Sequence, residues 1–389
     1  MNINSIDINT TVLVLTGGLI LCFSIQIFYY LFFYAKPLFY QNKIRKNETT
    51  QQTAGSYPGV SVIITAKNES QNLSKFLPSI LEQNYENFEV IVVNRGTTDE
   101  SEDILRTLKQ EYNNLYKTYV PANTKGVSLK KLALTVGIKA AKHNILLHTE
   151  ANNQPLSKDW IQSMVRNFDE KTEIVLGFSK LNNFGFASKL AGFDNLFAGL
   201  KYLSRAIMKH PYMGAGNNLA YRKELFFSKK GFFKWLNLQF GEDDLFVNES
   251  ANETNTRIEI SKESVTQSNI ESFKNWKDIK ICRQITQSYY KGQEVGMWRI
   301  EAISRLLFWG LTIAIGILYW DTLYIPAIAA ILFLLKFVVQ YIVINKSAKM
   351  LLIKPYGISL LLFDLLQPLF NIYFYLYKIF KRKNQYIRR

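Results

Sequence analysis

Residues 61–70 read SVIITAKNES, and residues 88–101 read FEVIVVNRGTTDES. Each stretch begins with a run of apolar, largely β-branched residues and ends in a polar turn. Continuous apolar runs of this length are typical of strands buried on both faces, as in a parallel sheet. Because ligands of such sheets bind beyond the carboxyl ends of the strands, the two polar turns mark the edge where we expect a binding site.

The surrounding region alternates strand-like and helix-like segments. Between residues 57 and 295, further apolar runs of β type occur at NILLHT (144–149) and EIVLGF (173–178), and helical stretches such as SKFLPSILEQ (74–83) separate the runs. This alternation predicts an α/β fold with a mostly parallel sheet flanked by helices.

Composition and charge narrow the class of partner. The 389 residues carry a formal net charge of +16, and the densest basic segments border apolar runs, as in KIFKRKNQYIRR (378–389). A nucleic-acid-binding protein would gather its basic residues in a stripe with interleaved aromatic residues, so we expect a membrane partner and no nucleic acid. The two cysteines, Cys22 and Cys282, stand far apart, which fits a reducing compartment.

Apolar runs near both ends of the chain predict transmembrane helices. Residues 11–35 carry no charge, and about 20 apolar residues suffice to cross a bilayer as a helix. The run is too long for a signal peptide and no small-residue cleavage site follows it, so we expect an uncleaved anchor. Two further spans are expected at residues 303–320 and 323–344. The predicted division is residues 1–38 as anchor, 39–56 as linker, 57–295 as cytosolic domain and 296–389 as C-terminal membrane region.

A third apolar run in the C-terminal region covers residues 357–377 and contains Asp364, Gln367 and Pro368. The basic loop before this run and the basic tail after it both favour the cytosol, whereas a full crossing would put them on opposite sides. We therefore expect a re-entrant or interfacial hairpin that breaks at Pro368. A true third crossing is the alternative.

Three further motifs follow in order along the domain. They are KKLALTVGIKAA (130–141), GAGNNLAYRKELF (214–226) and GEDDLFV (241–247). Together with the two opening stretches, this ordered set resembles glycosyltransferase family 2, of the GT-A fold, in its bacterial membrane-bound subgroup. The resemblance implies inverting transfer of a sugar from a nucleoside-diphosphate sugar to a lipid-linked or envelope glycan acceptor. It also implies a multi-pass protein of the bacterial inner membrane with a cytoplasmic catalytic domain.

The resemblance assigns the two strand-end turns to nucleotide binding. The residues concerned are Thr65, Ala66 and Glu69 at the first turn, and Asn94 and Arg95 at the second. Family members usually carry acids at the second pair of positions. An Asn amide can still pair with a base edge, and an Arg adds positive charge toward a phosphate. Ordinary turn and cap residues are the alternative at both turns.

The resemblance also predicts contacts to the diphosphate. Lys130 matches the basic residue of a helix that faces the nucleotide, and Arg283 would pair with the leaving diphosphate. Where family members generally carry Asp-x-Asp, this chain has Glu150 and Asn152. Side chains two apart on an extended segment point the same way, and hard cations prefer oxygen ligands. We therefore expect Mg²⁺ or Mn²⁺ to bind weakly, with the diphosphate supplying much of the ligation.

The acidic motif supplies the expected general base. Inverting transfer needs a base that takes the acceptor's hydroxyl proton, and a carboxylate is suited to this. The resemblance matches Asp243 to the base, Asp244 is its rival, and mutual repulsion with Glu242 raises proton affinity. An acidic helix N-terminus that complements the macrodipole is the alternative. The segment expected to line the acceptor and donor-sugar pocket holds Gly216, Asn217 and Asn218.

A second hypothesis comes from another class of protein. The acids missing at Asn94, Arg95 and Asn152 also fit a catalytically degenerate membrane subunit that binds a nucleotide or a partner. A transporter is poorly supported, because the predicted spans are few and most of the chain has the pattern of an α/β domain.

Overall fold

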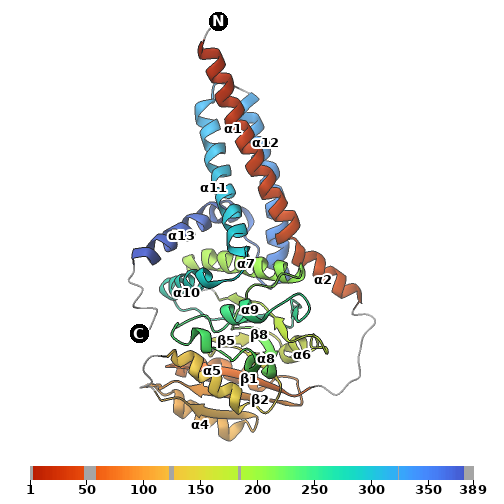
Figure 1. The fold of residues 1–389 in the computed structure, drawn as a ribbon, viewed down its shortest axis with the longest axis vertical. Coiled ribbons are helices and arrows are strands. Elements are labelled where there is room, and N and C mark those ends of the chain that lie inside the picture. The colour runs from red at the N-terminus through yellow and green to blue at the C-terminus, as the bar shows by residue number, and fades with distance from the viewer. Residues whose placement is uncertain (1–2, 48–57, 122–126, 183–184, 323, 381–389) are drawn as a thin grey trace.

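The computed structural model describes residues 3–47, 58–121, 127–182, 185–322 and 324–380. Over these residues the protein consists of an α/β body and a stalk of long helices that projects from it (Figure 1). The stalk comprises α1 (Ile3–Phe28), α11 (Glu294–Leu318) and α12 (Tyr324–Met350). Helix α7 (Phe186–Ile207) lies between the stalk and the sheet (Figure 1).

The body is built on a seven-stranded sheet with the order β3-β2-β1-β4-β8-β6-β9. Strands β3, β2, β1 and β4 are parallel, whereas β8 runs antiparallel between β4 and β6. This confirms the mostly parallel α/β sheet predicted from the sequence. The strands are β1 (Val60–Ala66), β2 (Phe88–Asn94), β3 (Leu115–Tyr119), β4 (Ile145–His148), β6 (Ile174–Leu176), β8 (Leu219–Arg222) and β9 (Thr256–Ile258). A second sheet has the order β5 (Asn153–Pro155), β10 (Thr266–Ser268) and β7 (Ser179–Leu181).

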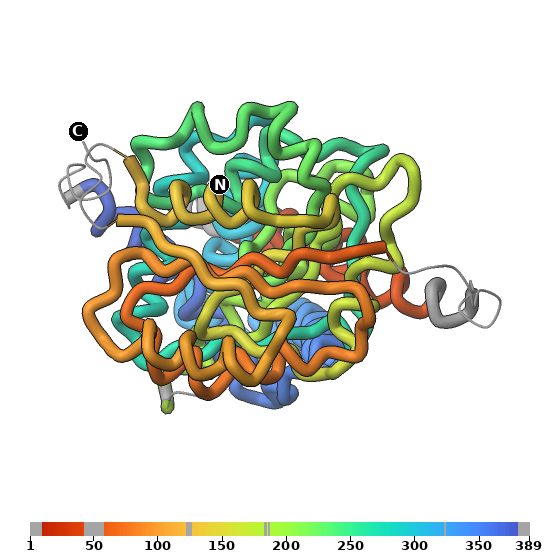
Figure 2. The backbone as a smooth tube through the Cα atoms, turned by 90° about the horizontal axis from the view of Figure 1, so that it is seen from below, coloured from red at the N-terminus to blue at the C-terminus, as the bar shows by residue number. Residues whose placement is uncertain are grey.

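The apolar runs of β1 and β2 follow from burial on both faces of the sheet. Ile63 and Val93 belong to one core cluster, whereas Val62 and Val90 belong to the opposite one. The covering helices are α5 (Leu129–Ala140) on the first side, and α3 (Ser70–Leu81) and α4 (Ser101–Glu111) on the second. Successive side chains of a strand point to opposite faces, so two covered faces require apolar residues at every position. Figure 2 shows this layered body from below, with the C-terminal helices behind it.

The remaining helices of the body are shorter. They are α6 (Trp160–Val165), α8 (Lys223–Ser228), α9 (Asp244–Ser250) and α10 (Phe273–Thr286). Helices α9 and α10 lie on the side of the sheet that faces the stalk (Figure 1).

Stalk and body share one hydrophobic core. The ring of Tyr34, at the end of a π-helical turn (Tyr29–Tyr34), lies 4.9 Å from the ring of Phe197 on α7 and 5.9 Å from that of Trp298 on α11. All three side chains are buried. Packed aromatic side chains therefore fix the stalk to the body.

The first part of the segment predicted as a linker, residues 39–56, is helical. Helix α2 (Lys36–Asn47) covers the beginning of that range, because Leu38 and Tyr40 pack against the shared core. The polar composition of the segment concealed this contact. Residues 48–56 lie outside the described part of the chain.

The prediction that the last apolar run breaks at Pro368 is wrong. Helix α13 (Leu360–Phe380) continues through this proline. A proline removes one backbone donor, but Asp364 and Gln367 on the preceding turn are buried and hydrogen-bonded to α11, which holds the helix in place. Helix α13 lies across the base of the stalk and not alongside its helices (Figure 1).

Membrane association is indicated by the length and composition of the helices. In the part of the chain that the structure describes, four helices are long and apolar enough to cross a membrane. They are Thr10–Asn42, Glu294–Leu318, Tyr324–Met350 and Gly357–Ile379. The spans expected at residues 303–320 and 323–344 correspond to α11 and α12.

Candidate active site

A cavity of about 480 Å³ lies beyond the carboxyl end of β4. The predicted donor and metal residues in its lining are Lys130, Glu150, Asn152 and Arg283. The predicted acceptor and base residues in its lining are Gly216, Asn217, Glu242, Asp243 and Asp244. Thr65 lines a small neighbouring cavity together with Glu150 and Asp243. The fold thus gathers most of the predicted residues at one edge of the sheet.

Lys130 joins two of the acidic motifs. Helix α5 begins here because the Ser128 hydroxyl caps its first turn. The Lys130 Nζ lies 2.7 Å from Glu150 Oε1 and 2.6 Å from Glu242 Oε1. Burial alone would lower the pKa of Lys130, but the two acids raise it above its ordinary value. Lys130 in turn lowers the pKa of Glu150, so this charged cluster persists at neutral pH.

Asp243 faces the cavity from the start of α9. Its Oδ2 accepts a hydrogen bond from the backbone N–H of Gly216 at 2.7 Å, and its Oδ1 accepts one from Asp244 N–H at 2.8 Å. A Cβ on residue 216 would stand 3.1 Å from the Asp243 Cβ, so glycine permits this close approach. Burial raises the pKa of Asp243, and Glu242 adds to the effect. A general base needs a carboxylate that is accessible to the substrate and has a raised pKa, and Asp243 is partly buried with a raised pKa.

Asp244 has different surroundings from Asp243. It is buried, and its Oδ2 accepts hydrogen bonds from the hydroxyls of Thr286 and, at 2.7 Å, Tyr290. Burial and the charge of Asp243 raise the pKa of Asp244 to about 7. Because Asp243 is only partly buried whereas Asp244 is buried and bonded to two side-chain hydroxyls, Asp243 is the better candidate for contact with a substrate.

Two guanidinium groups add positive charge at or near the site: Arg283 lines the cavity, whereas Arg95 is not part of its lining. The backbone N–H of Arg95 donates to Ala66 O at 2.9 Å, which ties the two strand-end turns together. Its buried Nε has no hydrogen-bond partner, and burial lowers the pKa of Arg95 although Glu242 and Glu150 oppose this. Neither Arg95 nor Arg283 takes part in an ion pair within the described residues. Both cations are therefore available to an anionic ligand.

Several predicted contacts lie outside the cavity. Asn94 is buried, its amide donates to Glu102 at 3.1 Å, and its oxygen accepts from the Thr97 N–H, so its side chain shapes the turn. Asn218 is fully buried and accepts from the Trp160 indole at 3.1 Å, so it serves the core and does not line the predicted pocket.

The first turn also departs from its predicted role. Ala66 is fully buried in β1. Glu69 accepts a hydrogen bond from the Asn72 amide at 2.6 Å, burial raises its pKa, and it is not part of the cavity lining. Thr65 is the residue of this turn that comes nearest to the acidic cluster.

Few side chains of the site are placed to coordinate a divalent cation. Glu150 shares its carboxylate with Lys130, and Asn152 uses its amide N–H to donate to Asn269 O at 3.0 Å, which leaves its amide oxygen available. Among the described residues, no group of three or more His, Cys, Asp or Glu side chains is placed to hold a metal. These residues fit Mg²⁺ or Mn²⁺ only when a ligand such as a diphosphate brings further oxygens.

Two residues of the site carry no sequence signal. Asp194 on α7 lines the cavity, and its Oδ1 accepts from Lys280 Nζ at 2.8 Å. Tyr290 reaches Asp244 from beyond α10. Both contacts join segments that are distant in the chain, so no local spacing marks them.

Comparison with known proteins agrees with this geometry. Residues 61–227 match the model of the family described as Glycosyl transferase family 2. Its fold is similar to that of the mannosyltransferase PcManGT from Pyrobaculum calidifontis, solved in complex with GDP-Man and Mn²⁺, with a TM-score of 0.56 and 17% identity over 93% of this chain and 100% of that one. At this identity the likeness shows the GT-A-like fold.

Two named relatives match shorter stretches. A poly-beta-1,6-N-acetyl-D-glucosamine synthase of Staphylococcus aureus is 27% identical over 127 residues, which cover 32% of this chain and 29% of the relative. A beta-monoglucosyldiacylglycerol synthase of Nostoc is 32% identical over 84 residues, which cover 21% of this chain and 16% of the relative. The chain thus spans less than a third of the length of either relative.

Proposed function

We propose that the protein is an inverting glycosyltransferase that moves a sugar from a nucleoside-diphosphate sugar to a lipid-linked or envelope glycan acceptor. The observation that carries this proposal is that Glu150, after β4, and Asp243, before α9, line one cavity. Arg283 lines this cavity, and Arg95 interacts electrostatically with Glu242 and Glu150 without lining it; both guanidinium groups suit a diphosphate. The relatives support the choice of substrates, since their names describe synthases of a glucosamine polymer and of a glycolipid.

The chemical step is a single displacement. The acceptor's hydroxyl oxygen attacks the anomeric carbon from the face opposite the diphosphate, and a new C–O bond forms. The bond from that carbon to the diphosphate oxygen breaks, and its electron pair leaves with the nucleoside diphosphate. The hydroxyl proton passes to Asp243, whose carboxylate is oriented by the N–H groups of Gly216 and Asp244.

Positive charge near the diphosphate lowers the barrier to its departure. Arg283 and Arg95 supply guanidinium groups that pair well with phosphate oxygens. Lys130 orients Glu150 and Glu242 at the same time. A divalent cation held by Glu150 and Asn152 would further neutralise the charge that develops on the leaving group.

We also propose that the protein lies in the bacterial inner membrane with its α/β body in the cytoplasm. The four apolar helices support membrane insertion. The basic residues Lys346, Lys349 and Lys354 follow the apolar part of α12, and basic loops favour the cytoplasmic side.

Replacement of Asp243 tests the assignment of the base. Asp243→Asn keeps the shape and loses the basic oxygen, so sugar transfer by the detergent-solubilised full chain should fall by about 10²–10⁴-fold. Donors are screened as a panel of UDP- and GDP-sugars, with release of the nucleoside diphosphate as the readout. Asp103→Asn, at an exposed acid on α4, is the matched control and should keep the wild-type rate. Full activity of Asp243→Asn would refute the assignment.

A non-catalytic nucleotide-binding subunit is the second candidate. It is favoured by the engagement of Glu150 with Lys130 and by the small donor set for a metal. Calorimetric titration with UDP and GDP, with and without Mn²⁺, separates the two proposals. A nucleotide affinity that is the same with and without Mn²⁺, together with no hydrolysis of any donor in the panel, would favour the non-catalytic subunit over the enzyme.

A further inference from the structure

A second cavity, of about 530 Å³, adjoins the candidate active site. Its walls come from α7, α10, α11 and α13, so it lies where the body meets the apolar helices. Asp194, Lys280 and Arg283 line both cavities and form their common wall. A molecule in the second cavity therefore ends beside the place proposed for the diphosphate.

The lining of the second cavity is rich in cations. Its basic residues are Lys201, Lys280, Arg283, Arg299 and Lys378, and its one acid is Asp194. Lys280 pairs with Asp194 at 2.8 Å, and Lys201 approaches Glu301 at 3.6 Å. Arg283 and Arg299 form no ion pair within the described residues. The cavity thus carries excess positive charge, which suits an anionic group.

The other wall of the cavity is apolar and open to the outside. Ile303 on α11 is 58% exposed, and Ile372 and Tyr375 on α13 are 46% and 48% exposed. Leu307 and Leu369 extend these exposed faces along the two helices. On helices that are long and apolar enough to lie in a membrane, such faces contact lipid chains.

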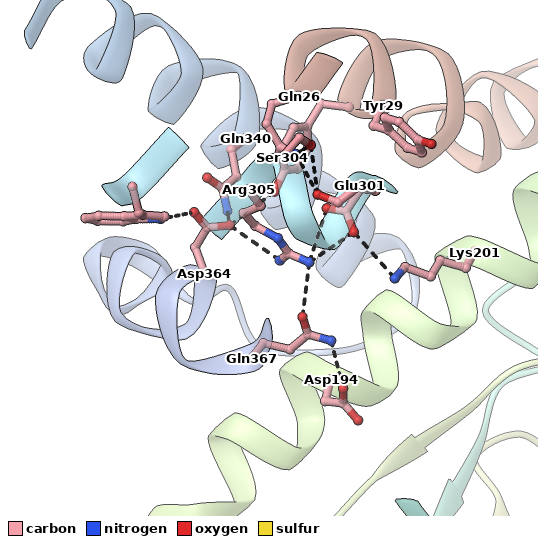
Figure 3. A network of polar contacts seen from close by, with 12 residues as sticks. Gln26, Tyr29, Asp194, Lys201, Glu301, Ser304, Arg305, Gln340, Asp364 and Gln367 are labelled. Atoms are coloured by element: carbon pink, nitrogen blue, oxygen red, sulfur yellow. Dashed lines mark hydrogen bonds and ion pairs between the residues drawn. The ribbon is translucent and has the colours of Figure 1, made fainter. Parts of the chain in front are cut away.

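A buried polar network holds the walls of this cavity in place (Figure 3). Gln367 on α13 donates to Asp194 on α7 at 2.9 Å and accepts from Arg305 on α11 at 3.1 Å. Arg305 pairs with Glu301, one turn earlier on α11, at 3.1 Å. These contacts connect α7, α11 and α13, which form three of the cavity walls. The fold therefore holds the shape of the cavity.

We propose that the second cavity binds the phosphate group of an acceptor lipid whose headgroup also carries the hydroxyl that attacks the donor sugar. The headgroup lies between Arg283 and Arg299, and the hydrocarbon chain lies along the exposed faces of α11 and α13. Charge and apolarity are separated in the cavity as they are in such a lipid. This inference rests on the proposed transferase function, because it is the shared wall that brings the lipid to the donor sugar.

Binding of an amphiphilic phosphate tests the inference directly. The probe is tetradecyl phosphate, bound to the full chain in a neutral detergent and counted by native mass spectrometry. Arg299→Gln removes a cation that lines this cavity alone, so the affinity should fall about 5-fold, as for one partly exposed charged contact. Ile372→Asp places a negative charge at the mouth and should weaken binding by at least as much. Arg106→Gln, at an exposed cation on α4, should bind as the wild type does.

Further probes identify what the cavity recognises. Tetradecanol, which lacks the charge, and inorganic phosphate, which lacks the chain, should each compete poorly with tetradecyl phosphate. Equal competition by either compound, or wild-type affinity in both cavity variants, would overturn the lipid site. Donor hydrolysis is measured in the same preparations. If the wild-type protein binds the probe but hydrolyses no donor, the transferase proposal is contradicted. If Arg299→Gln loses probe binding but hydrolyses the donor as the wild type does, a separate acceptor site is supported.

Discussion

Asp243 and Asp244 are adjacent in sequence, but the fold separates their roles. Asp243 receives two backbone N–H groups and faces the cavity, whereas Asp244 is buried under the hydroxyls of Thr286 and Tyr290. Their charges interact, so the two carboxyls titrate as a coupled pair. Burial raises the pKa of both, to about 7 for Asp244.

The pH dependence of sugar transfer follows from the ionisation of Asp243, the proposed base. Since the base must be ionised, kcat/KM should rise with pH toward neutrality. Glu242→Gln removes the neighbouring negative charge that helps to raise the pKa of Asp243, so that pKa should fall and the acid limb of the profile should move to lower pH. Asp103→Asn is the control for an exposed acid. An acid limb that stays in place in Glu242→Gln would contradict this effect of the neighbouring charge.

The same pair makes a prediction about stability. Because the pKa of Asp244 is raised from 3.8 to about 7, the native state binds more protons than the unfolded state between these values. The free energy of unfolding should therefore fall as pH rises through this window, and Asp244→Asn should flatten that fall. Chemical denaturation at a series of pH values measures the slope.

At the scale of elements, the start of α9 determines where the acids point. Gly241 has φ +92°, a conformation that favours glycine, and a Cβ there would stand 2.4 Å from the Leu245 side chain. The turn is thus closed tightly around one glycine, and Glu242, Asp243 and Asp244 follow it directly.

Substitution of this glycine should disturb both stability and transfer. Gly241→Ala is expected to cost about 1–3 kcal/mol of unfolding free energy through backbone strain, and to lower transfer more than nucleotide binding because the acids shift. Thermal unfolding and transfer assays measure the two effects. Gly296→Ala on α11, where no atom lies within 4 Å of the added Cβ, is the matched control. Equal behaviour of the two variants would contradict a special role for the turn.

At the scale of the whole molecule, a polar network connects the apolar helices to the body. Asp364 on α13 accepts from Lys336 on α12 and, at 2.8 Å, from the Trp309 indole on α11. Gln26 on α1 donates to the Glu301 carbonyl at 3.0 Å (Figure 3). Through Gln367 the network reaches Asp194, which lines the active-site cavity.

Removing one partner of the buried Asp364–Lys336 ion pair should lower the stability of the protein more than removing both partners. Asp364→Leu leaves the buried Lys336 without its anion and should lower stability by about 3–5 kcal/mol, measured by thermal unfolding in detergent. The double variant Asp364→Leu, Lys336→Leu should recover part of that loss, because no uncompensated charge from this pair remains. Asp321→Asn, at an exposed acid after α11, is the control. A double variant less stable than the single one would contradict this account.

Local pattern was enough to predict the sheet, and most of the residues that it singled out line the candidate cavity. Continuous apolar runs identified β1, β2, β4 and β6, since only strands covered on both faces need them. Local pattern failed to predict the role of a residue whose contact partners are distant in the chain. Asn218 resembled a pocket residue but bonds within the core, and α13 continues through Pro368 because neighbouring helices hold it.

What the sequence by itself determined is therefore the fold class of the domain, the edge of the sheet where the candidate site lies, and the acidic and basic residues near that edge, because strand periodicity and turn chemistry are local properties. Only the tertiary structure decided which acid faces the candidate active site, which cations form no ion pair among the described residues, and where the second cavity lies. These depend on contacts across many tens of residues, such as Lys130 with Glu242 and Asp194 with Lys280, and no local spacing encodes them.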